Sequence, residues 1–121
     1  MPSLQLVYGA LTRVSEKDIA YIAGTKTSVI ARGVMQKYFD YYDDIPQKAK
    51  LHELFDEGET LSGFLIRFAL SVSGITTLII GSGSEEHIIA NAGAAEKGPL
   101  KPDVLEEAKK RLGCTLLIYS P

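Results

Sequence analysis

Hydrophobic residues along the chain occur as short continuous runs separated by longer stretches with helical periodicity. Short apolar runs bounded by Gly, Pro or Ser are typical of strands buried in a parallel sheet. The runs predict three strands and a candidate fourth, at Leu4–Tyr8, Ser28–Arg32, Thr76–Ile80 and Cys114–Tyr119.

The stretches between these runs carry apolar residues at the spacing of an amphipathic helix. Leu61, Phe64, Leu65 and Phe68 recur at i, i+3, i+4 and i+7 and define one buried helical face. Residues that favour helix starts and ends predict helices over residues 15–24, 48–55, 60–74, 85–95 and 102–113. We expect Gly24 to close the first of them, because glycine adopts positive φ readily.

The order of these elements is strand then helix, repeated at least three times. That order predicts an α/β fold in which three or four parallel strands are flanked by helices, with right-handed crossovers. The chain has 121 residues and no low-complexity linker, so we expect a single α/β domain over residues 1–121.

Composition excludes some classes of function. The net charge is -2, so there is no basic field to hold nucleic acid or an anionic membrane. A single cysteine, Cys114, cannot form an internal disulfide and fits a reducing, cytoplasmic compartment. That cysteine and two histidines lie far apart in the sequence and predict no metal site.

Residues 61–80 form a long apolar stretch that could be mistaken for a membrane span. Arg67 lies inside it, and a charge at mid-span costs about 2.5–3.5 kcal/mol. We therefore predict a helix followed by a strand, with Arg67 as a snorkelling or ion-paired structural residue.

A loop rich in Gly and Ser joins the third predicted strand to the next helix, in the sequence LIIGSGSEEHIIAN. The start of a helix favours an anion, glycines let the backbone approach it, and serine hydroxyls add donors. The loop is not a GxGxxG fingerprint, because Glu86 stands at the third glycine position. It also fits an ordinary turn with a serine cap, so phosphate binding and simple capping both remain open.

Three segments, in order and spacing, resemble the C-terminal part of the aldo/keto reductases. They are LQLVYGALTRVSEKDI, VIARGVMQKY and the long stretch from LIRFALSVSG to LEEAKKRL, together about residues 3–112. The resemblance implies the last three units of a (β/α)8 barrel, a fold of about 250 residues. It also implies that the catalytic Asp, Tyr, Lys and His of that family belong to earlier units, so no catalytic residue is assigned here.

The resemblance does imply residues that contact a cofactor, NADP(H) or NAD(H). Gln5 matches a position near the nicotinamide amide, and Arg32 and Gly33 match positions near the nicotinamide and pyrophosphate. The remaining matches, around the adenosine phosphate and adenine, are Gly81, Ser82, Gly83, Ser84, His87 and Asn91. Gly83 replaces a frequent Lys or Arg and two glutamates follow the loop, which leaves the choice between NADP and NAD open.

Three or four parallel strands cannot close a barrel, so two sheet edges and an apolar face stay uncovered. We therefore expect self-association as a C2 dimer, in which Cys114–Tyr119 as a fourth strand would bring the total to eight. The alternative is an open doubly wound sheet, in which that C-terminal strand covers one edge.

Three functional hypotheses follow. The first is an aldo/keto reductase-like fragment with a rudimentary phosphate-binding loop and no activity alone. The second is a non-catalytic homodimeric interaction protein that binds no dinucleotide. The third is a segment of a longer enzyme.

Overall fold

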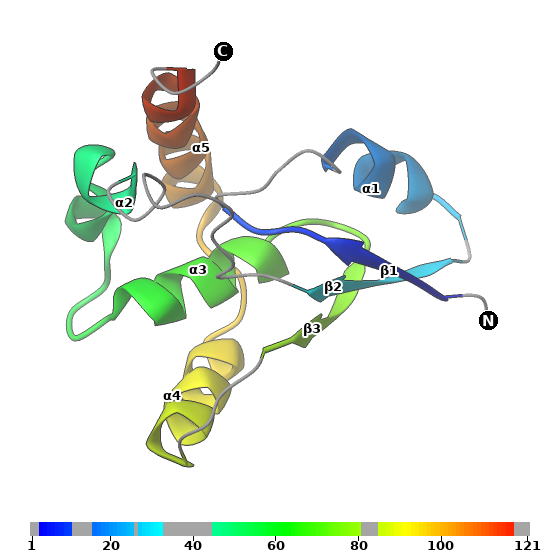
Figure 1. Ribbon diagram of the computed structural model, residues 1–121, viewed down its shortest axis with the longest axis horizontal. Helices are drawn as coiled ribbons and strands as arrows, with labels where there is room; N and C mark the ends of the chain where they lie inside the picture. Colours follow the sequence, from blue (N-terminus) through cyan, green and yellow to red (C-terminus); the bar gives the residue numbers. More distant parts are fainter. Residues whose placement is uncertain (1–2, 11–15, 26, 33–44, 81–84, 118–121) are drawn as a thin grey trace.

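The computed structural model describes residues 3–10, 16–25, 27–32, 45–80 and 85–117. Its strands are β1 (Ser3–Val7), β2 (Ser28–Arg32) and β3 (Ile75–Ile79). Its helices are α1 (Glu16–Ile22), α2 (Ile45–Lys48), the 3-10 helix η2 (Leu51–Leu54), α3 (Leu61–Leu70), α4 (Glu85–Glu96) and α5 (Pro102–Leu117) (Figure 1).

The three strands form one parallel sheet in the order β1-β2-β3. In the first pair Leu4 lies opposite Val29 and Leu6 opposite Ala31. In the second pair the register shifts at Val29/Ile30, and the hydroxyl of Thr76 donates to the carbonyl oxygen of Val29 at 3.2 Å. The predicted α/β fold with parallel strands is therefore confirmed for three strands.

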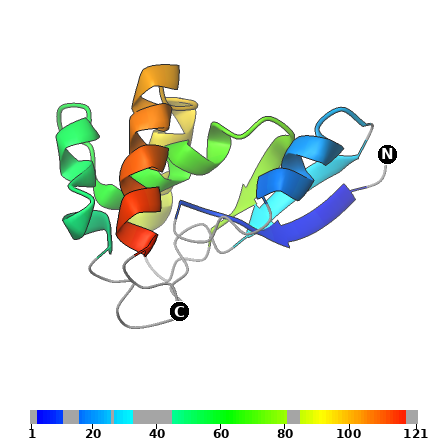
Figure 2. The same cartoon turned by 90° about the horizontal axis from the view of Figure 1, so that it is seen from above.

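One face of the sheet packs against helices. Val29 and Ala31 of β2 are fully buried there, since alternate residues of a strand point to the same face. α1 and α3 lie on this side of the sheet (Figure 2) and contribute Ile19, Phe64 and Phe68 to the same core. The apolar stripe predicted for residues 61–68 is thus the buried face of α3.

The other face of the sheet consists of the alternate strand residues, and we call it the open face. Its described side chains are exposed or half-buried: Ser3, Gln5, Ser28, Ile30, Arg32, Thr77 and Ile79. Parallel sheets are normally covered on both faces. The expectation that the strand from Leu4 is buried is wrong for Leu4 and Gln5: β1 is an edge strand, and Gln5 also lies on the uncovered face.

Two helix-boundary predictions have different outcomes. Thr60 caps α3 as expected, because its side-chain oxygen accepts a hydrogen bond from the backbone N–H of Gly63 at 3.1 Å. Gly24, in contrast, does not have positive φ, and α1 ends at Ile22. A glycine that packs against the end of α1, Gly74, does have positive φ (φ 101). A Cβ added to Gly74 would lie 3.0 Å from the Cβ of Ala23. The close approach of α1 to the turn before β3 therefore requires glycine at Gly74.

The end of the chain differs from the prediction. α5 continues through Gly113 to Leu117, so residues 114–117 are helical and the predicted fourth strand is wrong. Residues 118–121 lie outside the described residues. Of the helix predicted over 48–55, the structure has the 3-10 helix η2 at Leu51–Leu54, whereas Lys48 is the last residue of α2 and Lys50 between the two is left-handed. Pro46 lies in the first turn of α2, where a missing N–H costs no intrahelical bond.

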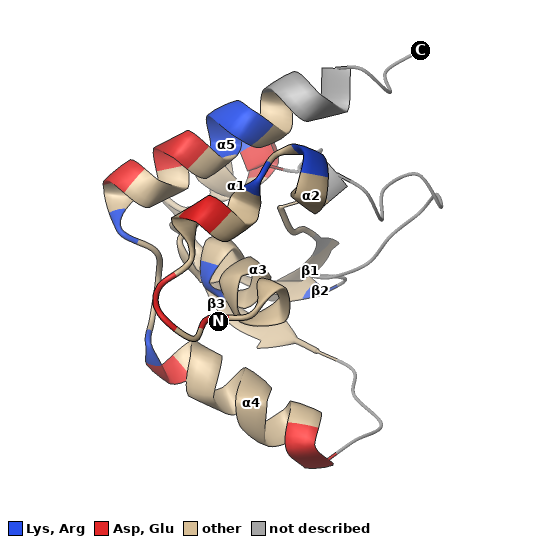
Figure 3. Cartoon of the chain, turned by 90° about the vertical axis from the view of Figure 1, so that its left-hand side faces the viewer, with Lys and Arg blue, Asp and Glu red and all other residues tan. Residues whose placement is uncertain are grey.

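Charge is distributed unevenly over the helices. Figure 3 shows acidic and basic residues along α5, whereas α4 carries acidic residues only near its ends. None of the described helices is long and apolar enough to cross a membrane. Residues 61–80 form α3 and β3, as predicted.

Candidate functional site

Two of the predicted site residues lie on neighbouring parallel strands, and one of them, Arg32, is at the edge where the carboxyl ends of the strands lie together. Gln5 lies opposite Ile30, and Val7 lies opposite Arg32. Gln5 and Arg32 therefore belong to the same open face of neighbouring strands, and both are exposed. The register brings these two predicted residues together although 27 positions separate them in the sequence.

Arg32 is the last residue of β2, and backbone hydrogen bonding to the neighbouring strands fixes its position. Its carbonyl oxygen accepts a hydrogen bond from the N–H of Tyr8 at 3.0 Å, and it lies opposite Ile79 of β3. Its guanidinium makes no hydrogen bond or ion pair to another residue that the structure describes. The open face thus carries an uncommitted cation beside the strand that leads into residues 81–84.

α4 begins at Glu85, directly after those loop residues. His87 and Asn91 are one helical turn apart and so lie on the same side of α4. His87 is exposed and Asn91 is half-buried. The other predicted site residues, Gly33, Gly81, Ser82, Gly83 and Ser84, lie outside the described residues.

The electrostatics of this edge are mixed. The N-terminus of a helix favours an anion, and Arg32 adds a full positive charge. Glu85 and Glu86 in the first turn of α4 are exposed and oppose a second negative charge. The start of α4 and Arg32 therefore each favour an anion, and the two glutamates oppose it.

Sequence analysis missed a partly buried cluster of Tyr8, Glu16 and Lys109. The Tyr8 side chain is fully buried, and its hydroxyl donates to Oε1 of Glu16 at 3.2 Å. The same oxygen pairs with Nζ of Lys109 at 2.9 Å. The cluster connects the end of β1, the start of α1 and the middle of α5. No local sequence signal links Lys109 to the other two residues, which lie about a hundred positions earlier.

Arg67 has the structural role that sequence analysis expected. Its side chain is 9% exposed and pairs with Asp56 at 3.0 Å and with Glu59 at 2.9 Å. It also donates to the backbone carbonyl oxygens of Gly98 and Pro99. Burial lowers the pKa of Arg67, but the hydrogen bonds to Glu59 and Asp56 outweigh it, so the pKa is raised. Arg67 therefore remains charged and joins the turn before α3 to the turn after α4.

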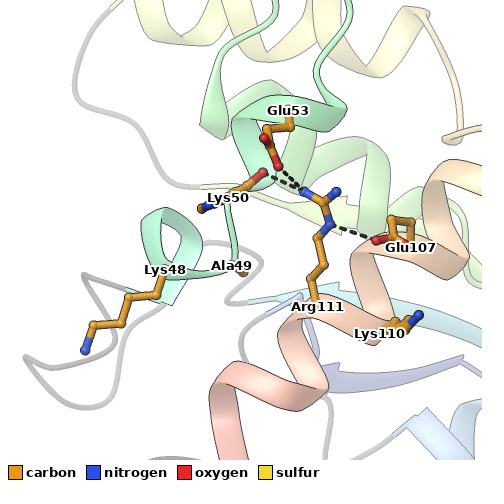
Figure 4. Close-up of a pocket in the computed structure, with 7 residues that line it drawn as sticks. All are labelled: Lys48, Ala49, Lys50, Glu53, Glu107, Lys110 and Arg111. Atoms are coloured by element: carbon orange, nitrogen blue, oxygen red, sulfur yellow. Dashed lines mark hydrogen bonds and ion pairs between the residues drawn. The ribbon is translucent and has the colours of Figure 1, made fainter.

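A shallow pocket of about 380 Å³ lies between η2 and α5, and Figure 4 shows the seven residues that line it. Arg111 crosses it and donates to Glu107, Glu53 and the backbone carbonyl oxygen of Lys50. The hydrogen bond to Arg111 lowers the pKa of Glu107. Lys48 and Lys110 point away from Arg111 in Figure 4, so the cations do not converge on a common ligand. We interpret this pocket as a structural contact.

The described residues contain no group of three or more His, Cys, Asp or Glu side chains that could hold a metal ion. The described part of the chain therefore gives no support for metal binding.

Comparisons with known proteins give matches in structure only. No protein-family model and no curated protein matches the sequence. Aldo-keto reductase AKR11C1 from Bacillus halodurans, in its holo form, matches with a TM-score of 0.73 and 21% identity, over 92% of this chain and 42% of that chain. Its apo form gives the same TM-score and identity and 43% coverage of that chain. A thermostable aldo-keto reductase, Tm1743, in complex with the inhibitor epalrestat, matches with a TM-score of 0.67 and 17% identity, over 90% of this chain and 39% of that chain.

These matches establish the fold. The chain has the architecture of part of an aldo-keto reductase barrel, as the sequence resemblance implied, and it spans less than half the length of the solved chains.

Proposed function

We propose that this chain forms the cofactor-binding part of an aldo/keto reductase-type protein and that it binds the phosphate of NADP(H) or NAD(H) weakly. The observation that carries the proposal is the structural match over 92% of the chain, combined with the position of Gln5 and Arg32 on one open sheet face. When bound, such a cofactor supplies a hydride for the reduction of a carbonyl group.

The residues at this edge have chemistry that suits a dinucleotide. The guanidinium of Arg32 is an uncommitted donor that can hold a phosphate with charge-assisted hydrogen bonds. The side-chain amide of Gln5 both donates and accepts, as recognition of a carboxamide requires. The loop over residues 81–84 would add its backbone N–H groups, and His87 and Asn91 would face the adenosine end.

We further propose that the isolated chain does not catalyse carbonyl reduction. The resemblance places the acid and base residues of the family in units that this sequence does not match. The open face is also exposed to water, whereas hydride transfer needs an enclosed and preorganised site. Incubation with NADPH and common aldehydes is expected to give no turnover above the buffer rate, and clear turnover would refute this part of the proposal.

Cofactor binding is tested by titrating the chain with NADPH, NADH and inorganic phosphate in a calorimeter. We expect weak binding of both dinucleotides and a loss of affinity of at least about tenfold in Arg32→Gln, because one charge-assisted contact contributes about 1.5–3 kcal/mol. Lys97→Gln removes an exposed cation at the far end of α4 and is expected to leave affinity unchanged. Equal affinities for both variants, or no binding at millimolar dinucleotide, would contradict the proposal.

A second function is favoured by the exposed apolar residues of β3 and α4. Ile79, Ile88 and Ile89 are 49%, 56% and 64% exposed. Burying such residues would stabilise a homodimer that acts as a non-catalytic interaction protein. A tight dimer in light scattering, whose melting temperature does not respond to NADP(H), supports this second function. A monomer whose melting temperature rises with NADP(H) supports the first.

A further inference from the structure

We propose that the exposed side of α4 binds α4 of a second copy of this chain, as an antiparallel pair of helices related by a twofold axis. This interface is the contact of the homodimer proposed above, so it rests on that second function and on no property of the cofactor site. It names the helix that forms the contact and the residues that fix its register.

α4 packs on its neighbour α3 with one side only. The half-buried residues Asn91 and Ala94 mark that side, and a Cβ added at Gly63 of α3 would lie 3.4 Å from the Cβ of Ala94. The opposite side carries Ile89 and Gly93, which are one helical turn apart and both exposed. Figures 1 and 3 show α4 at the lower end of the molecule, with no other described element beyond it. The middle of this side, with Ile89 64% exposed, is therefore an apolar surface open to a partner.

The exposed side of α4 is complementary to itself in shape. A Cβ added at Gly93 would meet no atom within 4 Å, so the glycine leaves a notch beside Ile89. In an antiparallel pair, Ile89 of each copy lies next to Gly93 of the other and fills this notch. The missing side chain also lets the two helix axes approach to the short end of the usual 8–10 Å. Glycine lowers helix propensity inside a helix, and this contact offsets that loss.

The charges near the ends of α4 fit the same register. Glu86 and Lys97 are eleven residues apart, about three helical turns, so they lie on the same flank of the Ile89–Gly93 surface. The N–H of Lys97 donates to the carbonyl oxygen of Ala94, which continues the last turn of the helix. The twofold axis brings Glu86 of one copy opposite Lys97 of the other. Both this pair and the Ile89–Gly93 pair are centred near residue 91, so one register satisfies both.

The same register also brings two like charges together. Glu85 and Glu96 are likewise eleven residues apart and lie on the other flank, where Glu85 of one copy meets Glu96 of the other. α4 is also short, about 18 Å for its 12 residues, so a pair buries less than the roughly 1,200 Å² of a standard interface. We therefore expect a reversible dimer that forms as the protein concentration rises.

The location of the interface is tested by sedimentation velocity of the 121-residue chain from about 10 µM to about 1 mM. Ile89→Lys places a charge in the middle of the exposed side of α4 and is expected to raise the dissociation constant at least about tenfold. Ile79→Lys is the matched control, because it introduces the same charge at a 49% exposed isoleucine on the open face of the sheet. It is expected to leave the dissociation constant unchanged.

Gly93→Leu tests the notch. Leucine has the higher helix propensity and adds apolar surface, so a non-specific association through α4 would become stronger. In the antiparallel register the leucine takes the space of Ile89. The dissociation constant is therefore expected to rise at least about tenfold, although α4 itself is stabilised.

Two neighbouring glutamates test the register. Glu85→Gln and Glu86→Gln each remove one charge from the first turn of α4, so their effects on the helix itself are similar. Glu86→Gln loses the two symmetric pairs with Lys97 and is expected to weaken the dimer about two- to tenfold. Glu85→Gln removes the repulsion from Glu96 and is expected to strengthen the dimer by a similar factor.

Other outcomes overturn the α4 interface and separate it from the homodimer itself. A dimer that Ile79→Lys dissociates and Ile89→Lys does not would keep the homodimer but place its contact on the open face. A monomer at every concentration would remove both. Equal effects of the two glutamine variants, or a stronger dimer with Gly93→Leu, would exclude the antiparallel register. Circular dichroism verifies that each variant remains folded, and the outcome of the dinucleotide titration bears on none of these results.

Discussion

At the scale of single residues, the guanidinium of Arg67 holds together segments that lie far apart in the sequence. Its partner Glu59 has a side chain that is only 3% exposed, so the carboxylate depends on Arg67 for compensation of its charge. Arg67→Met would leave this carboxylate buried without a counter-charge, with only the hydrogen bond from the backbone N–H of Asp56. We expect the free energy of unfolding to fall by about 3–5 kcal/mol, measured by urea denaturation.

Arg111→Met is the matched control for this prediction. Arg111 also bonds two glutamates and a backbone carbonyl, but these contacts are exposed and screened by water. Its loss is expected to change the stability much less. If the two variants were equally destabilised, the burial of Glu59 would not be the cause of the effect.

Arg67 and Arg32 show what a sequence can predict about single residues. A charge inside the apolar stretch 61–80 indicated that Arg67 is a snorkelling or ion-paired structural residue, and the structure shows that it is ion-paired. Its partners could not be predicted, because Gly98 and Pro99 follow it by more than thirty residues and are brought near by the packing of α4 on α3. At the candidate site, Gln5 and Arg32 could be placed on one face only once the register of β1 and β2 was known.

At the scale of elements, the predictions succeeded where long-range periodicity or caps defined the element. β2 has the predicted bounds, and α3 begins after its predicted cap Thr60. The prediction failed at residues 114–117, because a short apolar run fits a buried strand and a helix equally well. Gly113 was interpreted as a helix end, yet a glycine inside a helix costs only about 1 kcal/mol and the other contacts of α5 outweigh it.

Gly113→Ala distinguishes these two interpretations. Within a continuous α5, alanine has the higher helix propensity, and no atom lies within 4 Å of the added Cβ. The variant is expected to gain up to about 1 kcal/mol in the free energy of unfolding. If Gly113 instead closed the helix with positive φ, the same substitution would introduce strain and lower the melting temperature.

Gly58→Ala is the control for the opposite effect. Gly58 has φ 77 and also has no atom within 4 Å of an added Cβ, so only backbone strain distinguishes it from Gly113. We expect Gly58→Ala to destabilise the chain while Gly113→Ala stabilises it. A loss of stability in both variants would contradict the helix over residues 102–117.

At the scale of the whole molecule, the three parallel strands and their uncovered face follow from the sequence, since so few strands cannot close a barrel. The distribution of burial among the helices does not follow from it. α3 contains seven buried residues, from Gly63 to Ala69, whereas α4 contains none among its described side chains. Both were expected to be amphipathic helices of a flanking layer, yet α4, which packs on α3, buries none of its described side chains completely.

This uneven burial predicts uneven protection against hydrogen exchange. Amides in elements with many buried contacts open only through large unfolding events, whereas those in exposed helices open locally. β2 is paired on both sides, and α3 lies in the core. We therefore expect their amides to exchange at least about a hundredfold more slowly than those of α4 in the isolated chain, as measured by mass spectrometry. Protection of α4 equal to that of α3 would mean that self-association already covers Ile88 and Ile89. In that case the α4 amides would exchange more slowly at higher protein concentration, which would identify the dimer directly.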